Sequence, residues 1–362
     1  NVRDLITDFA DASSRWGGVW SRAGGGYIFE VTRRGSTDLW RLRENSWFRW
    51  GAAREQLTAG PLDFGSPAAI PGRSELIVTG TRRLGSLKRF DRATGKFLPY
   101  LDGISAEMTD FSRDGQWVVY SSFPDLQLWR RRVDGSEALP LTQAPWRAGA
   151  PRISPDGKYI AFTGDRGGDA LNAYIVPFAG GTPVRVTDGP SRIEVAPTWS
   201  PDSAQLLIRS DRPGTLLYNN VLQIVDLRTR RLTTIPDSTL RFNQRWSPDG
   251  NFIAATPNDE SELDLFDLRS GRWSVLAKMR ADYPNWTPDG KYIYFVSNAD
   301  AASSIYRVSL ESRQPELIAS LAQTERAIDD VWGQWAGVTP DGAPLVMENA
   351  DLQQIYMLTF EP

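Results

Sequence analysis

Two residue types are absent from this chain of 362 residues, which contains no cysteine and no histidine. Their absence excludes disulfides, metal sites built on thiolate or imidazole, and catalytic arrangements of the Ser-His or Cys-His kind. A chain without cysteine is compatible with either redox compartment. A surplus of positive charge is also lacking, because 41 Lys and Arg stand against 44 Asp and Glu, a formal charge of −3. Nucleic acid is therefore not expected as a partner.

Long hydrophobic runs are missing as well. The longest are short stretches such as residues 292–296, far below the roughly 18 apolar residues that a membrane helix needs. We expect neither a membrane span nor a signal peptide at the start of the sequence. What the chain has in abundance is 14 Trp, 31 Gly and 24 Pro. That composition favours short strands joined by tight turns, with large rings between layers and few helices.

A short motif recurs along the chain. Near-copies are ISPDGKYIAF at residues 153–162, WSPDGNFI at 246–253 and WTPDGKYIYF at 286–295. Weaker copies occupy 111–115, 199–203 and 338–342, and two degenerate ones, found from the strand that follows the turn, lie at 25–29 and 71–78. Such a period indicates a repeat architecture, and eight units account for the full length.

Each repeat combines a Ser/Thr-Pro-Asp-Gly hairpin turn with alternating strands, which predicts a four-stranded antiparallel meander. Such sheets bury both faces only by stacking in a closed ring. The prediction is an all-β fold: a single eight-bladed β-propeller over residues 1–362, with blades opening near residues 20, 67, 110, 152, 198, 245, 285 and 337. The last repeat lacks an outer strand, and residues 2–8 resemble one, so the N-terminal strand is expected to complete the last blade.

At these turns the sequence resembles the TolB-like (WD40-like) β-propeller repeat family, whose Trp/Phe-Ser-Pro-Asp-Gly-Lys signature opens each blade. The resemblance covers the whole chain. In segments 103–107, 283–286 and 355–358 the chain is similar to the C-terminal propellers of bacterial sensory proteins that carry a winged-helix regulator or a Ser/Thr kinase, with a membrane span between. The resemblance implies a bacterial binding or sensor module outside the cytoplasm.

The repeated acids and aromatics have structural explanations. The turn aspartates at 114, 156, 202, 249, 289 and 341 are expected to bond local backbone amides rather than a cation. The tryptophans at 199, 246 and 286 are expected to pack between blades. The acidic and glycine-rich segments at 259–264 and 165–169 are better explained as solvated loops than as Ca²⁺ sites. No catalytic residue, metal or cofactor is predicted.

Two surfaces are candidates for binding. Variable loops at the mouth where the innermost strands begin suit recognition, and this mouth is predicted to present Glu107, Trp146, Arg147, Arg192, Glu194, Arg241, Asn243, Asp282, Trp332 and Trp335. Its mixed charges and aromatics suit a peptide or protein segment. Outside the repeat pattern, Trp47, Phe48, Arg49 and Trp50 form a second possible partner contact.

Three functions remain open at this point. The leading expectation is a non-catalytic propeller that binds a ligand or protein as an extracytoplasmic sensory or assembly module. One alternative is a hydrolase or lyase that uses two carboxylates in the central funnel, although no feature selects such a pair. Another is the gating propeller of a prolyl-oligopeptidase-type peptidase, which would need a hydrolase domain that this sequence lacks.

Overall fold

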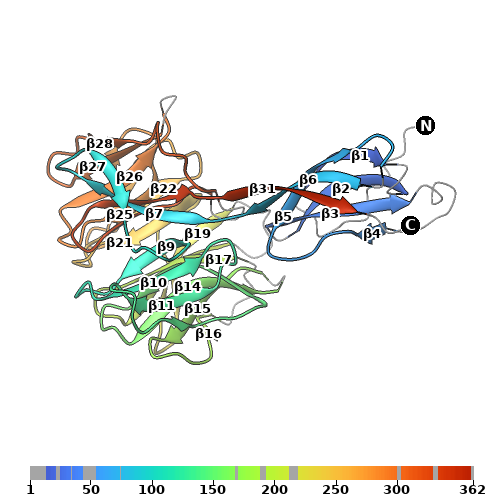
Figure 1. Cartoon of the computed structure of the whole chain (residues 1–362). Coiled ribbons are helices and arrows are strands. Elements are labelled where there is room, and N and C mark those ends of the chain that lie inside the picture. The colour runs from blue at the N-terminus through green and yellow to red at the C-terminus, as the bar shows by residue number, and fades with distance from the viewer. Residues whose placement is uncertain are drawn as a thin grey trace. The chain divides into compact units, whose positions relative to one another are not determined.

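The computed structural model describes residues 14–21, 25–33, 35–43, 54–73, 75–167, 170–187, 193–211, 219–299, 303–328 and 333–359. Within these ranges every regular element is a β-strand, as the turn-rich composition predicts (Figure 1). The chain divides into two compact units. The smaller comprises residues 1–84, 329–331 and 350–362, and the larger comprises residues 85–328 and 332–349.

Five sheets of the larger unit are meanders of consecutive strands, each ordered from the innermost strand outwards. They are β9 (Ala106–Phe111), β10 (Trp117–Ser122), β11 (Leu128–Arg132), β12 (Leu139–Pro140); β13 (Trp146–Ile153), β14 (Tyr159–Arg166), β15 (Asn172–Pro177), β16 (Val184–Arg185); β17 (Glu194–Trp199), β18 (Gln205–Asp211), β19 (Asn220–Asp226), β20 (Leu232–Thr234); β21 (Arg241–Trp246), β22 (Phe252–Pro257), β23 (Leu263–Asp267), β24 (Arg272–Ala277); and β25 (Asp282–Trp286), β26 (Tyr292–Ser297), β27 (Ser304–Ser309), β28 (Glu316–Ser320).

The sixth sheet of this unit joins two distant parts of the chain. Its order is β29 (Ala336–Val338), β30 (Pro344–Asn349), β7 (Gly85–Asp91) and β8 (Lys96–Pro99). The innermost strands contact one another in the order β9, β13, β17, β21, β25 and β29, and β29 contacts β9 again. The larger unit is therefore a closed six-bladed propeller, and β30 pairing with β7 closes it.

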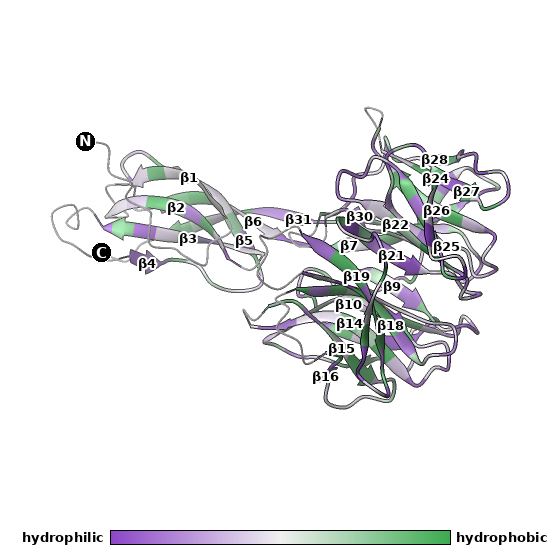
Figure 2. Ribbon diagram, turned by 180° about the vertical axis from the view of Figure 1, so that it is seen from behind, coloured by the Kyte–Doolittle hydropathy of each residue, from purple (hydrophilic) through white to green (hydrophobic). Residues whose placement is uncertain are grey.

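The core of the ring lies between neighbouring sheets. In one cluster Val119 and Leu128 of one blade pack with Ile160 and Phe162 of the next, and all four side chains are fully buried. Figure 2 shows that the strands of the ring carry the hydrophobic stretches, whereas the connections are largely hydrophilic. Both faces of each sheet are covered by its neighbours, which is why the strands are apolar on both sides.

The smaller unit contains two sheets. One is a meander of β1 (Ser14–Ser21), β2 (Gly26–Arg33), β3 (Ser36–Arg43) and β4 (Arg54–Gln56), and the other has the order β31 (Leu352–Thr359), β6 (Glu75–Arg82) and β5 (Asp63–Ala69). Ile28 and Leu39 of the first sheet share a buried cluster with Leu76 and Val78 of the second. The two sheets therefore pack together around a core of their own.

The eight antiparallel sheets agree in number with the eight repeats, and the all-β propeller class is confirmed. The closure predicted from the sequence needs correction. Six sheets form the ring, and the last blade is completed by β7 and β8 rather than by residues 2–8, which lie outside the described residues. From the sequence, the strands at residues 344–347 and 355–358 are expected in one blade. In the structure β30 and β31 follow each other without a hairpin, so that β30 pairs with β7 and β31 pairs with β6.

One local feature recurs in both units. The first strand of most sheets contains a β-bulge at a residue with positive φ: Gly17, Ser66, Met108, Ala150, Ala196, Asn243 and Tyr283. In each case except Ser66, the bulge lies three residues before the last large side chain of the strand. A bulge bends the strand and changes the direction of the side chains that follow. In the ring, the second residue after the bulge residue is thereby directed toward the central channel, as Asp110 is after Met108.

Candidate ligand-binding site in the channel

Six equivalent positions surround the channel, each just before the large residue that ends an innermost strand. We call them the channel ring: Asp110, Arg152, Thr198, Arg245, Asn285 and Gly337. The first five line a common cavity. The sixth is glycine because a Cβ at Gly337 would lie 2.4 Å from the ring of Trp335. Polar residues at these positions in otherwise apolar strands mark the channel as a site rather than as core.

The cavity has a volume of about 630 Å³ and opens on the side of the repeated turns. This volume falls in the range of small-molecule sites. Beyond the channel ring, its walls consist mainly of hydroxyl groups, indole rings and proline rings, with one further charged group, the guanidinium of Arg113. The residues are Thr109, Phe111, Ser112, Arg113, Pro155, Trp199, Pro201, Trp246, Ser247, Pro248, Trp286, Thr287, Pro288, Val338, Thr339 and Pro340.

The turns around the opening are held by their own side chains. In all six, the Ser or Thr hydroxyl donates to the Asp carboxylate two residues later, at 2.5 to 2.7 Å. The hydroxyl of Ser112, followed by the amide of Gln116, lowers the pKa of Asp114. The structural role predicted for these aspartates is thus supported by the geometry.

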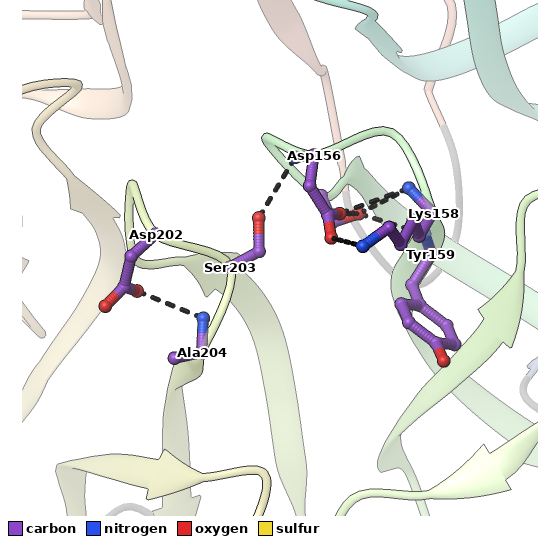
Figure 3. Close-up of polar contacts among 7 residues, drawn as sticks. Asp156, Lys158, Tyr159, Asp202, Ser203 and Ala204 are labelled. Carbon is purple, nitrogen blue, oxygen red and sulfur yellow. Dashed lines mark hydrogen bonds and ion pairs between the residues drawn. The ribbon is translucent and has the colours of Figure 1, made fainter.

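Turns of neighbouring blades also contact one another around the opening. The amide of Asp156 donates to the hydroxyl of Ser203 at 3.0 Å, as Figure 3 shows. Between the first and last blades, a Cβ on Gly115 would lie 3.2 Å from Pro340. The guanidinium of Arg113 reaches the carbonyl oxygen of Pro201, two blades away, at 3.3 Å, so this side chain extends over part of the opening.

Tryptophan side chains fix the backbone on which the channel arginines sit. The indole N–H of Trp199 donates to the carbonyl oxygen of Arg152 at 2.9 Å, and that of Trp286 donates to the carbonyl oxygen of Arg245 at 3.2 Å. Both indoles are buried, as predicted. Trp246 is only half-buried and bonds Gly250 of its own turn, so the prediction that it is core holds only in part.

The charges of the channel ring are desolvated. Burial raises the pKa of Asp110, against the effect of the Arg152 charge. Burial lowers the pKa of Arg152. Burial, followed by repulsion from Arg152, lowers the pKa of Arg245 strongly. The three charges therefore influence one another across the channel although they come from three different blades.

The opposite mouth, where the innermost strands begin, holds the residues that the sequence predicts for binding. Glu107, Glu194 and Trp335 are buried, with exposed fractions of at most 3%. They do not present their side chains to solvent, which corrects that part of the prediction. Half-buried positions are held by Trp146, Arg147, Arg241, Asn243 and Asp282. Arg192, Trp332 and the segment Trp47, Phe48, Arg49 and Trp50 lie outside the described residues.

The half-buried residues at this mouth largely bond one another or their own blades. Asn243 donates to Asp282 at 2.5 Å, and the ion pair of Arg241 with Asp264 measures 2.9 Å. Burial, with the charge of Glu260, raises the pKa of Asp282 to about 6. Trp146 packs edge-on against Tyr174 with ring centroids 4.9 Å apart. Much of the predicted rim thus bonds or packs against its own blade or the neighbouring one.

The channel ring was missed by sequence reasoning, although a signal existed. The residue just before the Trp, Phe, Ile or Val that precedes the turn occupies the same position in six of the repeats. That column contains Asp, Arg, Thr, Arg, Asn and Gly. A polar column beside an aromatic one, at the end of an alternating strand, indicates a channel-facing position.

Comparisons with known proteins agree with this architecture. The geometry defines a closed antiparallel β-propeller with a polar channel. A family model described as the TolB beta propeller domain matches residues 104–336, more than half of the chain, and the protein therefore belongs to this family. A solved structure from Agrobacterium tumefaciens, named as a TolB, superimposes with a TM-score of 0.59 at 18% identity, covering 74% of this chain and 98% of that one. That likeness supports the fold.

Curated relatives share part of the sequence. The chain is 30% identical over 174 residues to the Uncharacterized peptidase YuxL of Bacillus subtilis, which covers 47% of this chain and 25% of that protein. It is 26% identical over 220 residues to the Uncharacterized protein Atu1656 of Agrobacterium fabrum, with coverage of 58% and 68%. It is 28% identical over 159 residues to a Tol-Pal system protein TolB of Francisella tularensis, with coverage of 42% and 36%. The chain thus spans a quarter of the peptidase relative's length.

Neither a membrane-spanning helix nor a metal-binding cluster of acids is present among the described residues. In that part of the chain no helix has the length and hydrophobicity needed to span a membrane. Among the same residues, no group of three or more acids is placed to hold a metal ion.

Proposed function

We propose that this protein is a non-catalytic binding module that recognises a protein or peptide segment outside the cytoplasm, through the channel cavity on the turn side of the ring. The single observation that carries the proposal is the cavity of about 630 Å³, with indole and proline walls and a polar floor. Aromatic walls with a few placed polar groups are typical of ligand sites. Membership of the TolB propeller family supports a binding role.

The chemistry of the cavity favours binding over hydrolysis. Among the described residues that line it, Asp110 is the one acid. Glycoside hydrolysis by the usual route needs an acid and a second carboxylate about 5 to 10 Å apart. The sequence has no histidine or cysteine to act in place of the missing partner.

The mouth where the innermost strands begin stays a second proposed surface. Its half-buried residues Trp146 and Arg147 would contact a partner there. The cavity lies on the other side, with the turns, and for this reason we place the principal site there. The segment Trp47, Phe48, Arg49 and Trp50 also stays a proposed partner contact.

One observation favours a second function, the gating propeller of a larger peptidase. The relative named as a peptidase is 30% identical over a stretch that makes up 25% of its length. On this reading a separate domain would perform the hydrolysis. The genomic reading frame around this sequence tests it, because a hydrolase domain in the same frame would support gating and its absence would count against it.

The proposed site can be tested by cross-linking. A photoreactive amino acid at Pro288, on the turn side, should capture a partner in the producing cells, whereas one at Arg147, at the opposite mouth, should not. The captured protein is identified by mass spectrometry, purified and titrated against the wild type and Trp246→Ala. Weaker binding by the variant supports the cavity. Capture at Arg147 alone, or unchanged affinity, would place the site elsewhere.

Catalysis is tested separately with panels of peptide, ester and glycoside substrates. We expect no turnover. Hydrolysis that disappears in Asp110→Asn would overturn the non-catalytic assignment, because Asp110 is the one cavity acid among the described residues.

A further inference from the structure

The two arginines of the channel ring have few protein partners. Nη1 of Arg152 donates to the carbonyl oxygen of Pro151 at 2.8 Å, and Nη1 of Arg245 donates to that of Gln244 at 2.9 Å. Each bond goes to the preceding residue's backbone, and a guanidinium carries five N–H donors. Nε of Arg245 is buried without a hydrogen-bond partner, and the whole residue is 9% exposed.

No carboxylate of the described residues forms an ion pair within 4.0 Å of either guanidinium. The nearest candidate, Asp110, instead accepts the backbone N–H of Ile153 at 2.7 Å through Oδ2. The three charges of the channel ring sum to one positive charge, and Arg113, which is exposed at the opening, adds a second to the cavity lining. Unpaired buried charges are costly, because the protein interior does not replace the water they have lost. An arrangement of this kind is stabilised by an anion in the cavity.

The arginines are also held in place. Their carbonyl oxygens accept the indole N–H groups of Trp199 and Trp286 at 2.9 and 3.2 Å, so the backbone at both positions is fixed from the neighbouring blade. Both arginines line the same cavity, and their side chains extend from β13 and β21 with Thr198 of β17 between them in the ring. A fixed backbone limits the entropy lost when the guanidinium groups close on a ligand.

The surplus charge and the walls select the class of anion. Within the channel ring the net charge is one positive charge, which a monoanion neutralises, and Asp110 repels a second negative charge there. A guanidinium matches the planar fork of a carboxylate with two parallel hydrogen bonds. The cavity is much larger than an inorganic ion, and the rings of Trp199, Trp246 and Trp286 along its wall suit the organic body of a ligand.

We propose that Arg152 and Arg245 bind a carboxylate of the peptide segment, either its C-terminus or an acidic side chain, inside the channel cavity. This inference rests on the proposed function and names the chemical group that the site recognises. Arg245 supplies the buried donor, and Arg152 supplies the donor from the blade two places away in the ring. Asp110 sets the limit of one negative charge.

The test uses isothermal titration calorimetry with four probes: sodium acetate, sodium sulfate, and a short tryptophan-containing peptide with either a free or an amidated C-terminus, all at constant ionic strength. A third peptide, amidated but with an internal glutamate, distinguishes a side-chain carboxylate from a terminal one. The variants are Arg152→Gln, Arg245→Gln and, as a matched control on the exposed outer strand β24, Arg272→Gln. Thermal unfolding without added anion accompanies each titration.

We expect at least one carboxylate peptide to bind, the neutral amide to bind at least about tenfold more weakly, and each channel variant to lose at least about tenfold, since bonds to charged groups are worth that much. Arg272→Gln should bind as the wild type does. Acetate should be preferred over sulfate. Without anion, Arg245→Gln should unfold at a temperature equal to or above that of the wild type, because it removes an unpaired buried charge.

Three results would overturn the inference: equal binding of the acid and amide peptides, unchanged carboxylate binding by Arg245→Gln, or tighter binding of sulfate than of acetate. The proposed function fails in a different way. If acetate binds through Arg245 but none of the peptides binds, the carboxylate site stands and the peptide assignment falls. If the peptides bind regardless of charge and of Arg245, the peptide site stands and the carboxylate inference falls.

Discussion

At the scale of single residues, the same side-chain type has different roles according to its surroundings. The turn aspartates accept bonds from a hydroxyl and a backbone amide at the surface, and Asp114 is held ionised by them. Asp282 accepts bonds from Asn243 and from the amide of Tyr283, yet burial dominates and raises its pKa to about 6. Position in the blade, more than residue type, decides the charge state.

This contrast gives a pH prediction for Asp282. Its pKa in the folded state is about 6, above the value of 3.8 that an aspartate ordinarily has and that the unfolded chain restores. The folded state therefore holds the proton more tightly, so the stability from this group is complete below about pH 4 and is lost as pH rises through about 6. Asp282→Asn should remove that loss. We expect it to exceed the wild type in unfolding free energy by about 1 to 3 kcal/mol at pH 7.5 and to match it near pH 4.

Urea titrations at pH 4 and pH 7.5 measure the unfolding free energy of the wild type and of Asp282→Asn. The turn aspartates titrate in both proteins, so their contribution cancels when the two free energies are subtracted. A difference that is the same at both pH values would show that Asp282 is not protonated preferentially in the folded state.

At the scale of the element, the innermost strand combines three functions in four residues. The bulge turns the strand, the next polar residue faces the channel, and the final large residue packs between blades. In β25 these are Tyr283, Asn285 and Trp286. Asn285 also donates to Ala336 of the next innermost strand at 3.1 Å. The same short segment thus builds core, site and blade contact.

The packing function predicts unequal effects of two tryptophan substitutions. Trp286→Ala should cost about 3 to 5 kcal/mol of unfolding free energy, because a buried ring and its bond to the next blade are lost. Trp246→Ala should cost clearly less, since that ring is half-buried and lines the cavity. Chemical denaturation of both variants checks the order, and equal costs would mean that Trp246 contributes as much core as Trp286.

At the scale of the whole molecule, ring closure depends on segments far apart in sequence. β7 and β8 come before the five consecutive blades, β29 and β30 come after them, and β30 pairs with β7 over Gly85 to Arg89. Buried Leu345, Val346 and Met347 contribute to two of the clusters that join this sheet to its neighbours. The closing sheet is therefore part of the core.

A truncation series tests this closure. A fragment of residues 85–349 keeps all six sheets and should be soluble and unfold cooperatively. A fragment of residues 104–336 lacks β7, β8 and β30, leaves strand edges unpaired and should aggregate. Size-exclusion chromatography and thermal unfolding distinguish them. If the shorter fragment were as soluble and as stable as the longer one, closure by β7 and β30 would not be what holds the ring.

The turns, the meanders and the propeller class could be predicted from the sequence because they depend on contacts within a few residues, such as Ser247 with Asp249. The closure could not, because the partner of β30 lies more than 250 residues away and competing strands have similar apolar patterns. The channel ring was within reach as a column of the repeat. The burial of Glu107 was not, because it follows from packing between blades that the repeat does not encode.

The bonds from Trp199 to Arg152 and from Trp286 to Arg245 have a consequence for how such rings can change over generations. Each channel arginine belongs to one repeat and the indole that positions it belongs to the following repeat. Duplication or exchange of a single repeat would therefore separate the two. The heritable unit of this site is a pair of successive repeats, so a descendant that loses a single blade should keep an arginine without its indole or an indole without its arginine.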